Sequence, residues 1–237
     1  MKQKILAIGT IIMLSAVVSY AQSSPQTPPK ASLYIKGGFN LANVTVTKGG
    51  AIDANKALPS FNVGLQGDLP IGSYFAIQPG VFFTGKGSKL SSGDINGNNW
   101  YRATTRPYYI EIPVNAVVKI PVADETSLFF GAGPYLGIGV GGKNRVEGEA
   151  AGVSYSRSEK IKFSDDDPFT SQEEGSGYNI VRRFDYGLNG TVGVQSHFAL
   201  FSVNYGWGLA KVQSGTTSSE DALGKYRVLS FNLGFRL

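Results

Sequence analysis

The sequence predicts an all-β fold: an eight-stranded antiparallel up-and-down transmembrane β-barrel with short periplasmic turns and long extracellular loops. Segments of alternating apolar and polar residues recur from residue 32 to the end of the sequence. Most of them reach the ~9–11 residues that a tilted strand needs to cross a bilayer. The connections between them alternate between short and long. Barrels of the bacterial outer membrane combine these three features.

The first 21 residues have the organisation of a secretory signal peptide. Lys2 and Lys4 precede an apolar run over residues 5–18, and Ser19 and Ala21 supply the small side chains of a cleavage site. The apolar run is shorter than the ~18 residues of a spanning-helix candidate. We therefore expect a signal peptide over residues 1–21 that directs export through the Sec pathway, a periplasmic leader over residues 22–31, and a barrel over residues 32–237.

Composition excludes several classes of protein. The chain has no cysteine, which excludes an acylated lipoprotein, a disulfide framework and a cysteine-ligated metal site. Signal cleavage would remove two lysines and lower the formal net charge from +5 to +3, which is no footprint for nucleic acid. The 31 glycines and 12% aromatic residues favour a β-rich chain with many turns. In lipid such a chain must close into a barrel, because an open sheet edge would leave backbone groups unpaired.

Eight segments form the predicted strands: residues 32–43, 60–69, 74–87, 106–120, 127–141, 181–195, 199–209 and 226–237. In the first four segments, the polar face carries Asn, Gln, Lys, Asp and Glu. The opposite, apolar faces are, in order, Leu33-Ile35-Phe39-Leu41, Phe61-Val63-Leu65-Leu69, Phe75-Ile77-Val81-Phe83 and Tyr108-Ile110-Ile112-Val114-Ala116-Val118-Ile120. This spacing of two residues is the period of a strand with one apolar side.

The last four segments continue the pattern. The fifth opposes its apolar face with glycines, and the other three oppose theirs with Arg, Asp, Asn, Gln and Ser. The apolar faces are Leu128-Phe130-Ala132-Leu136-Ile138-Val140, Phe184-Tyr186-Leu188-Val192-Val194, Phe201-Val203-Tyr205-Trp207-Leu209 and Leu229-Phe231-Leu233-Phe235-Leu237. Aromatic rings near the segment ends suit the membrane–water interface.

Connection lengths predict which end of the barrel is which. The short connections are residues 70–73, 121–126 and 196–198, and the long ones are residues 44–59, 88–105, 142–180 and 210–225. Outer-membrane barrels have tight periplasmic turns and longer outer loops. With an even number of strands, both termini are then expected in the periplasm.

Alternation by itself does not say which face is outside. A soluble lipocalin-like barrel also has eight strands, but it buries its apolar side chains. Here the polar faces are rich in Gly, Asn, Gln and Ser and carry scattered charges, which makes a poor solvated exterior and a plausible packed interior. We therefore expect the apolar faces to meet lipid in the cell outer membrane of a Gram-negative envelope.

Four motifs resemble the outer-membrane β-barrel domain family that includes PorT-type proteins. They are Phe75-Ala76-Ile77-Gln78-Pro79 with the later Gly85-Lys86-Gly87, then Tyr109-Ile110-Glu111-Ile112-Pro113, Gly131-Ala132-Gly133-Pro134-Tyr135, and Phe184-Asp185-Tyr186-Gly187-Leu188. The motifs follow the family's order and cover most of the mature chain. Gly80, where the family often has an acidic residue, and the terminal Leu237, where Phe or Trp is usual, depart from the pattern. The resemblance implies an integral outer-membrane protein and, for PorT-type members, a part in protein secretion.

Two features of the sequence are candidates for a chemical site. The one histidine, His197, lies in a predicted periplasmic turn near Ser196 and Ser202, with no carboxylate beside it in sequence. We interpret it as a solvated turn residue, because a catalytic base must first lie within reach of its substrate. The acidic run Asp165-Asp166-Asp167, with Glu173 and Glu174, offers oxygen ligands for a divalent cation, but its spacing fits no EF-hand. We predict no catalytic residue, no cofactor and no metal site.

Charged residues on the polar faces predict two structural layers inside the barrel. The upper layer contains Glu111, Lys86, Arg183 and Asp185, and the lower layer contains Lys36, Asp68, Lys119 and Arg236. The bore of an eight-stranded barrel is narrow enough for side chains to fill it. Buried charges there must find partners. We expect the two layers to plug the bore and to fix the register of the strands.

The expected function is that of a non-enzymatic scaffold or interaction platform acting through extracellular loops. The alternatives are a PorT-type subunit of a secretion or assembly machine, a narrow solute channel, and a lipid-modifying barrel enzyme. The expected partners are outer-membrane lipid and lipopolysaccharide, the barrel-assembly machinery and a protein at the extracellular loops, with no nucleic acid.

Overall fold

The computed structural model describes residues 30–45, 57–94, 97, 99–164, 180–212 and 224–237. Their strands are β1 (Ser32–Thr45), β2 (Leu58–Pro70), β3 (Phe75–Gly85), β4 (Ser88–Gly93), β5 (Trp100–Ala123), β6 (Thr126–Ala150), β7 (Val153–Lys160), β8 (Lys162–Ser164), β9 (Ile180–Arg182), β10 (Phe184–Gln195), β11 (Ala199–Gly208) and β12 (Lys225–Arg236). Among these residues, no helix has the length and apolar character needed to span a bilayer.

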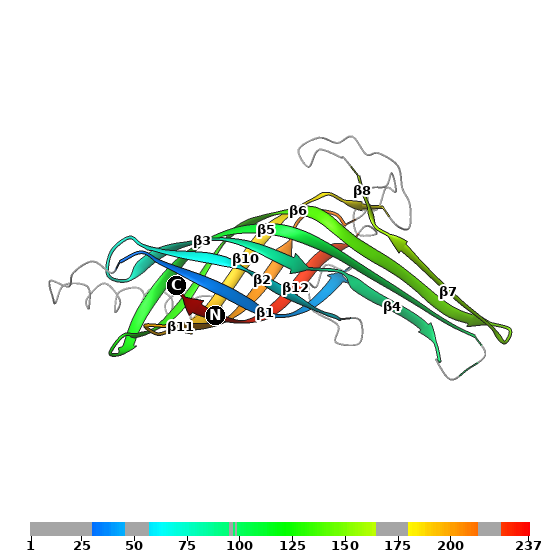
Figure 1. Ribbon diagram of the computed structural model, residues 1–237, viewed down its shortest axis with the longest axis horizontal. Helices are drawn as coiled ribbons and strands as arrows, with labels where there is room; N and C mark the ends of the chain where they lie inside the picture. The colour runs from blue at the N-terminus through cyan, green and yellow to red at the C-terminus, as the bar shows by residue number, and fades with distance from the viewer. Residues whose placement is uncertain (1–29, 46–56, 95–96, 98, 165–179, 213–223) are drawn as a thin grey trace, which may run out of the picture.

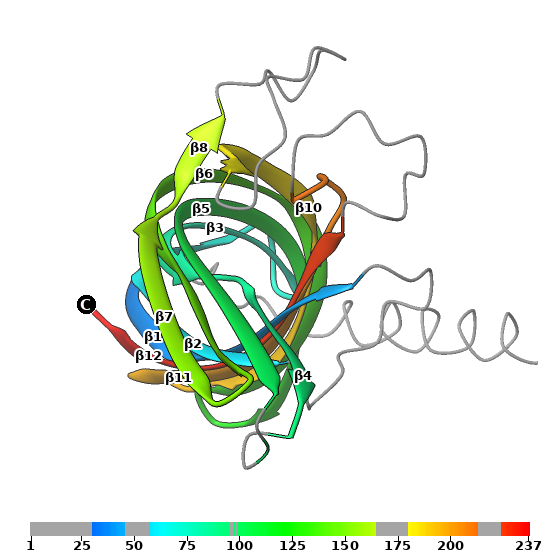
Figure 2. The same cartoon turned by 90° about the vertical axis from the view of Figure 1, so that its right-hand side faces the viewer.

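A closed ring of strands forms the body of the molecule (Figures 1 and 2). In the described part of the chain it contains eight strands in the order β1-β2-β3-β5-β6-β10-β11-β12, and β12 pairs with β1 to close it. All neighbours in the ring are antiparallel. The predicted all-β, eight-stranded, up-and-down barrel is therefore confirmed.

The side chains sort as a membrane barrel requires. Apolar residues such as Phe39, Leu65 and Val192 are about half exposed on the outer surface, whereas polar residues such as Asn40, Gln66 and Thr191 are buried within the ring. The soluble lipocalin-like alternative is excluded by this arrangement, because it would place the apolar faces inside. The outward apolar residues of β5 run from Tyr108 to Ile120, about 40 Å along a strand. At a tilt of ~40° this covers roughly 30 Å, enough for the apolar band of an outer-membrane barrel.

Strands β5 and β6 continue far beyond this band. β5 has 24 residues and β6 has 25, and beyond Tyr108 they still pair with each other from Arg106↔Lys143 to Trp100↔Glu149. β4 adds to β5 on one side and β7 adds to β6 on the other. We call this part, made of β4, residues 100–106 of β5, residues 142–150 of β6, and β7, the extension. It projects from the ring in Figure 1.

The extension differs from the loops expected over residues 88–105 and 142–180. Its strands lack an apolar face: every residue of β7 except Glu159 is exposed. Because period-2 hydrophobicity marks only strands with one buried or lipid-facing side, the pattern predicts nothing where both sides meet water. Pairing with β5 and β6, rather than burial, holds these segments extended.

The opposite end of the barrel carries tight turns. Residues 71–74, Asp124–Glu125 and residues 196–198 join the strand pairs there, and Tyr34 near the start of β1 pairs with Arg236 at the end of β12. Both ends of the barrel domain therefore lie at the turn end, away from the extension. The expected sorting of short and long connections is present in the described residues.

The boundary between barrel and extension is set by Lys86 and Gly87, between β3 and β4. The backbone N–H of Lys86 donates to the carbonyl of Pro107 at 3.0 Å. Gly87 has a φ of +132°, and a Cβ at this position would collide with the carbonyl oxygen of Thr105. Glycine is required here because other residues rarely adopt such a backbone and lack the space.

Candidate functional site

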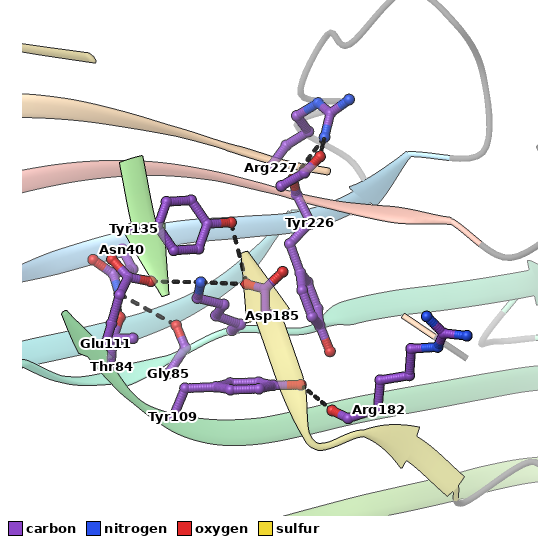
Figure 3. A network of polar contacts seen from close by, with 12 residues as sticks. Asn40, Thr84, Gly85, Tyr109, Glu111, Tyr135, Arg182, Asp185, Tyr226 and Arg227 are labelled. Carbon is purple, nitrogen blue, oxygen red and sulfur yellow. Dashed lines mark hydrogen bonds and ion pairs between the residues drawn. The ribbon is translucent and has the colours of Figure 1, made fainter. Parts of the chain in front are cut away.

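The upper part of the bore is organised around one buried lysine. Lys86 extends its Nζ to Glu111 Oε2 of β5 at 2.5 Å and to Asp185 Oδ2 of β10 at 2.6 Å. Lys86 and Asp185 are each 2% exposed. Figure 3 shows Glu111 and Asp185 reaching the bore from different strands. A cation between two carboxylates leaves this cluster with a formal charge of −1.

Tyrosine rings surround the lysine. Its Nζ lies 4.3 Å from the centroid of the Tyr135 ring, 5.5 Å from that of Tyr109 and 5.9 Å from that of Tyr226. The hydroxyl of Tyr135 donates to Asp185 Oδ2 at 3.1 Å. Gly187 of the neighbouring strand makes room, since a Cβ there would lie 2.8 Å from Tyr135 Cε1. Sequence reasoning missed these rings, although Tyr135 has the strand parity of the fifth segment's inward glycines.

An apolar cap covers this end of the bore. Ile161 and Val181 pack with Val212 and the buried Tyr109 and Tyr226. The Phe163 ring joins them, with its centroid 5.9 Å from that of Tyr109. Ile161, Phe163 and Val212 come from segments that the sequence assigned to loops, and Val181 is the first residue of the predicted sixth strand. Buried apolar contacts of this kind exclude water from the mouth of the bore.

The lower part of the bore is organised around Asp68 of β2, which is 2% exposed. Lys119 of β5 forms an ion pair with its Oδ2. Gln195 donates to Oδ2 at 3.1 Å, and Gln78 donates to Oδ1 at 3.2 Å. The carboxylate is therefore fully engaged by three strands. Such charge-assisted hydrogen bonds are stronger than neutral ones.

An apolar cluster fills the same end. Tyr34, Ala76, Val117, Phe129 and Leu200 come from different strands of the ring and pack together at 0–2% exposure. The sequence predicted a polar interior and did not indicate this cluster, because its members are scattered among polar residues and glycines on the inward faces of five strands. Its rings and methyl groups narrow the bore beside the Asp68 ion pair.

Between the two ends lies a small polar cavity of about 50 Å³. Lys36, 3% exposed, lines it and donates from Nζ to Gln66 Oε1 at 2.9 Å. Asn62 donates to Asn40 Oδ1 at 2.6 Å, and Asn40 donates to Thr84 Oγ1 at 3.0 Å. The cavity has room for only a few water molecules.

The structure thus places the eight predicted charged residues in five settings. It brings Lys86, Glu111 and Asp185 together, and Lys119 with Asp68. Lys36 lies at the central cavity, where its Nζ donates to the amide oxygen of Gln66. Arg183 lies between β9 and β10, where its carbonyl accepts from the N–H of Gly139 at 2.7 Å. Arg236 is exposed at the turn end and lines the open mouth there.

His197 lies in an exposed turn with its Nδ1 3.7 Å from Glu125 Oε1, so folding supplies a carboxylate that its sequence neighbours do not. Both side chains are about two-thirds exposed, and the Ser196 hydroxyl donates to the carbonyl of Ala199 at 3.1 Å. The acidic run over residues 165–174 lies outside the described residues, and no group of metal-ligating side chains occurs within them.

The chain is similar to several solved structures. The chain is similar to the attachment invasion locus protein Ail of Yersinia pestis, solved with the heparin analogue sucrose octasulfate: the identity is 11%, the match covers 88% of this chain and 100% of that one, and the TM-score is 0.39. It is similar to neisserial surface protein A at 13% identity, with 88% and 99% covered and a TM-score of 0.39. It is also similar to OprG of Pseudomonas aeruginosa at 11% identity, with 89% and 97% covered and a TM-score of 0.35. A comparison with curated proteins gives no match.

The family comparison covers most of the chain. Residues 20–214 match the model described as the outer membrane protein beta-barrel domain. The match agrees with the closed ring, the outward apolar faces and the buried polar interior. This chain is an outer-membrane β-barrel protein and belongs to the outer membrane protein beta-barrel domain family.

Proposed function

We propose that the protein is a sealed, non-enzymatic barrel that anchors the extension at the cell surface as an interaction platform, with both termini in the periplasm. The observation that carries the proposal is the continuation of β5 and β6, as paired strands, well beyond the apolar band. A barrel that only spanned the membrane would need ~9–11 residues per strand. The additional length builds a sheet that has no role in crossing lipid.

Closure of the bore supports an anchor over a channel. Side chains fill both ends of the bore: the layer around Lys86 with one apolar cluster, and the layer around Asp68 with the other. Only a small cavity lies between them. We propose that the two charged layers act as a plug and fix strand register. Purified protein in planar bilayers is expected to show no steady single-channel conductance. A stable, reproducible conductance step would favour the narrow channel instead.

The orientation is testable because the chain has no cysteine. Ser154 lies in the extension and Ser73 lies in a turn at the other end, and both are exposed. We expect a membrane-impermeant maleimide to label Ser154→Cys in intact cells and to label Ser73→Cys only after the outer membrane is permeabilised. Labelling of Ser73→Cys alone in intact cells would invert the proposed orientation.

The extension offers two open sheet edges for a partner. Within the described residues, β4 pairs only with β5, and β7 pairs only with β6. An unpaired strand edge can accept a further strand from another protein. Chemical cross-linking in cells should yield a partner adduct through Ser158→Cys, an exposed position of β7. The same adduct should be absent from a variant in which residues 147–156 are replaced by a two-residue turn.

The same experiment separates the other roles. Copurification with large envelope complexes, retained after shortening of residues 147–156, would favour a subunit of a secretion machine over the platform. A change in lipid A mass that depends on His197 would favour a lipid-modifying enzyme. We expect neither, since His197 lies at the turn end, away from the surface leaflet in the proposed orientation.

A further inference from the structure

Basic side chains gather on one face of the extension. A surface groove there is lined by six cationic residues, Lys89, Arg102, Arg106, Lys143, Arg145 and Lys160, and by one carboxylate, Glu147. The net formal charge of this lining, +5, equals that of the entire 237-residue chain. The net positive charge of the protein is therefore carried by this groove, because the positive and negative residues elsewhere balance.

Strand register places three of these cations side by side. Arg106 of β5 is opposite Lys143 of β6, and Lys143 is opposite Lys160 of β7. Directly opposed side chains have Cβ atoms about 4.5–5.5 Å apart, and like charges in such pairs destabilise a sheet. Glu147 pairs with Arg145 at 2.5 Å, and the described residues place no carboxylate in an ion pair with the row of three. An anion bound across the row would remove this repulsion.

The groove adjoins a lipid-facing aromatic cluster. Arg106 and Tyr108 share one face of β5, two residues apart, and Tyr108 lines the groove. The Tyr108 ring stacks on Phe83 with centroids 5.3 Å apart, and both rings contact Phe61 at about 6 Å. Phe61 is 48% exposed on the outside of the barrel. Moving outward along β5, this face thus changes from apolar Ile110 to aromatic Tyr108 to basic Arg106 within four residues.

We propose that this groove is a binding site for the phosphate-bearing headgroup of a membrane glycolipid. Arg106, Lys143 and Lys160 hold the phosphate, and the acyl chains lie along Phe61, Phe83 and Tyr108. A soluble polyanion would use the cations but would gain nothing from aromatic rings at the edge of the bilayer. With the orientation proposed above, the lipid belongs to the outer leaflet. This inference rests on that orientation only for the choice of leaflet.

Lipid binding to the purified full-length barrel tests the site. Native mass spectrometry in detergent would count lipid A bound per barrel, with dephosphorylated lipid A and phosphatidylcholine as reference lipids. The triple variant Arg106→Gln, Lys143→Gln, Lys160→Gln should lose about 100-fold in affinity for lipid A, since each basic residue beside an anionic surface contributes roughly fivefold. A folded triple variant that binds lipid A as tightly as the parent would overturn the proposal.

A matched variant controls for net charge. Lys30→Gln, Arg157→Gln, Lys162→Gln removes three positive charges outside the groove and should change lipid A affinity less than twofold. An equal loss in this variant would show a general charge effect and reject the site. The conservative variant Arg106→Lys, with the cation kept, should retain most of the binding.

A further comparison separates a lipid from a soluble polyanion. Tyr108→Ala should weaken binding of lipid A and leave binding of a heparin fragment unchanged. If heparin binds as tightly as lipid A and Tyr108→Ala affects neither, the groove serves a soluble polyanion and the lipid proposal fails. Because these measurements use purified protein, they hold whichever way the barrel is inserted. A reversed labelling pattern in cells would therefore contradict the proposed surface platform and leave the proposed lipid site unaffected.

Discussion

Two regions of the molecule are built from the same two strands. In the barrel, β5 and β6 turn Ile112 and Leu136 outward to lipid, while Asn115 faces a packed interior. In the extension the same strands carry Arg106 and Lys143 on the corresponding face. The hydrogen-bonded ladder is continuous through both regions, with a shift at Tyr108 and Tyr109. Whether lipid or water surrounds a strand, rather than its backbone pairing, therefore decides where every second residue must be apolar.

The regions also differ in how they hold charge. In the barrel, Lys86 is buried and Lys119 is partly buried, and both are paired with carboxylates from other strands. In the extension, basic residues stand beside one another on an exposed face. Buried charges without partners are very costly, whereas exposed ones are screened by water and salt. The same residue type therefore has a structural role in one region and is free to bind a ligand in the other.

Lys86→Met is expected to have the largest effect on stability. It removes the cation between Glu111 and Asp185 and leaves a buried and a partly buried carboxylate uncompensated, at a cost of about 3–5 kcal/mol. Urea unfolding in lipid vesicles measures the loss. Lys89→Met, on the neighbouring β4, is the control and should stay within about 0.5 kcal/mol, as is usual at surface positions. Equal losses in both variants would remove the distinction between the regions.

Ile112→Arg tests which side of β5 meets lipid. Ile112 lies near the middle of the outward apolar row, and arginine there should cost about 2–4 kcal/mol. Val153→Arg, on a residue of β7 that is 68% exposed, should cost less than about 0.5 kcal/mol. The readout is again urea unfolding in vesicles. No loss for Ile112→Arg would mean that this face does not lie in the membrane.

Gly87→Ala tests the junction between the regions. Gly87 has a φ of +132° and its position faces the Thr105 carbonyl, so alanine should cost about 2–3 kcal/mol. Gly152, at the tip between β6 and β7, has a φ of +79° with open space around it, and alanine there should cost roughly 1 kcal/mol. A smaller cost at Gly87 than at Gly152 would show that the junction is not constrained.

Lys36→Met should have the smallest effect, although Lys36 is as buried as Lys86. Its amide partner, Gln66, is neutral, so methionine removes a desolvated charge without exposing a carboxylate in contact with it. Replacing a buried charge with an apolar side chain of similar volume is often neutral or stabilising. We expect a change within about 1 kcal/mol by the same unfolding assay. A loss as large as that of Lys86→Met would show that Lys36 balances the charge of the Lys86 cluster from a distance.

Much of the barrel could be predicted from particular residues. The alternating row from Tyr108 to Ile120 predicted both a strand and its lipid-facing side, and both are confirmed. The expected ends of that strand were wrong, because β5 begins at Trp100. Residues 100–106 have no apolar face, because the alternation of apolar and polar residues is needed only where the strand crosses lipid. Strand ends in the extension depend on pairing with β4 and β6, which a single sequence does not show.

The sequence predicts which charged residues point into the bore, but not which residues they contact there. Strand parity predicted that Lys86, Glu111 and Asp185 point into the bore, and the structure brings them together. It could not show that Tyr109, Tyr135 and Tyr226 surround them, because the ring of strands and the glycines that admit the rings come from distant segments. Nor could it separate Lys36 from Asp68, since their heights depend on strand tilt and register.

The fold class, the number of strands in the barrel and the lipid-facing side all follow from the amino-acid sequence, because a period of two on one face is a local property of each strand. Tertiary structure alone decided which buried charges meet, how the bore is closed, and that Arg106, Lys143 and Lys160 stand in one row. Those contacts depend on the register between strands distant in sequence, and a shift of one residue would turn every side chain to the opposite face.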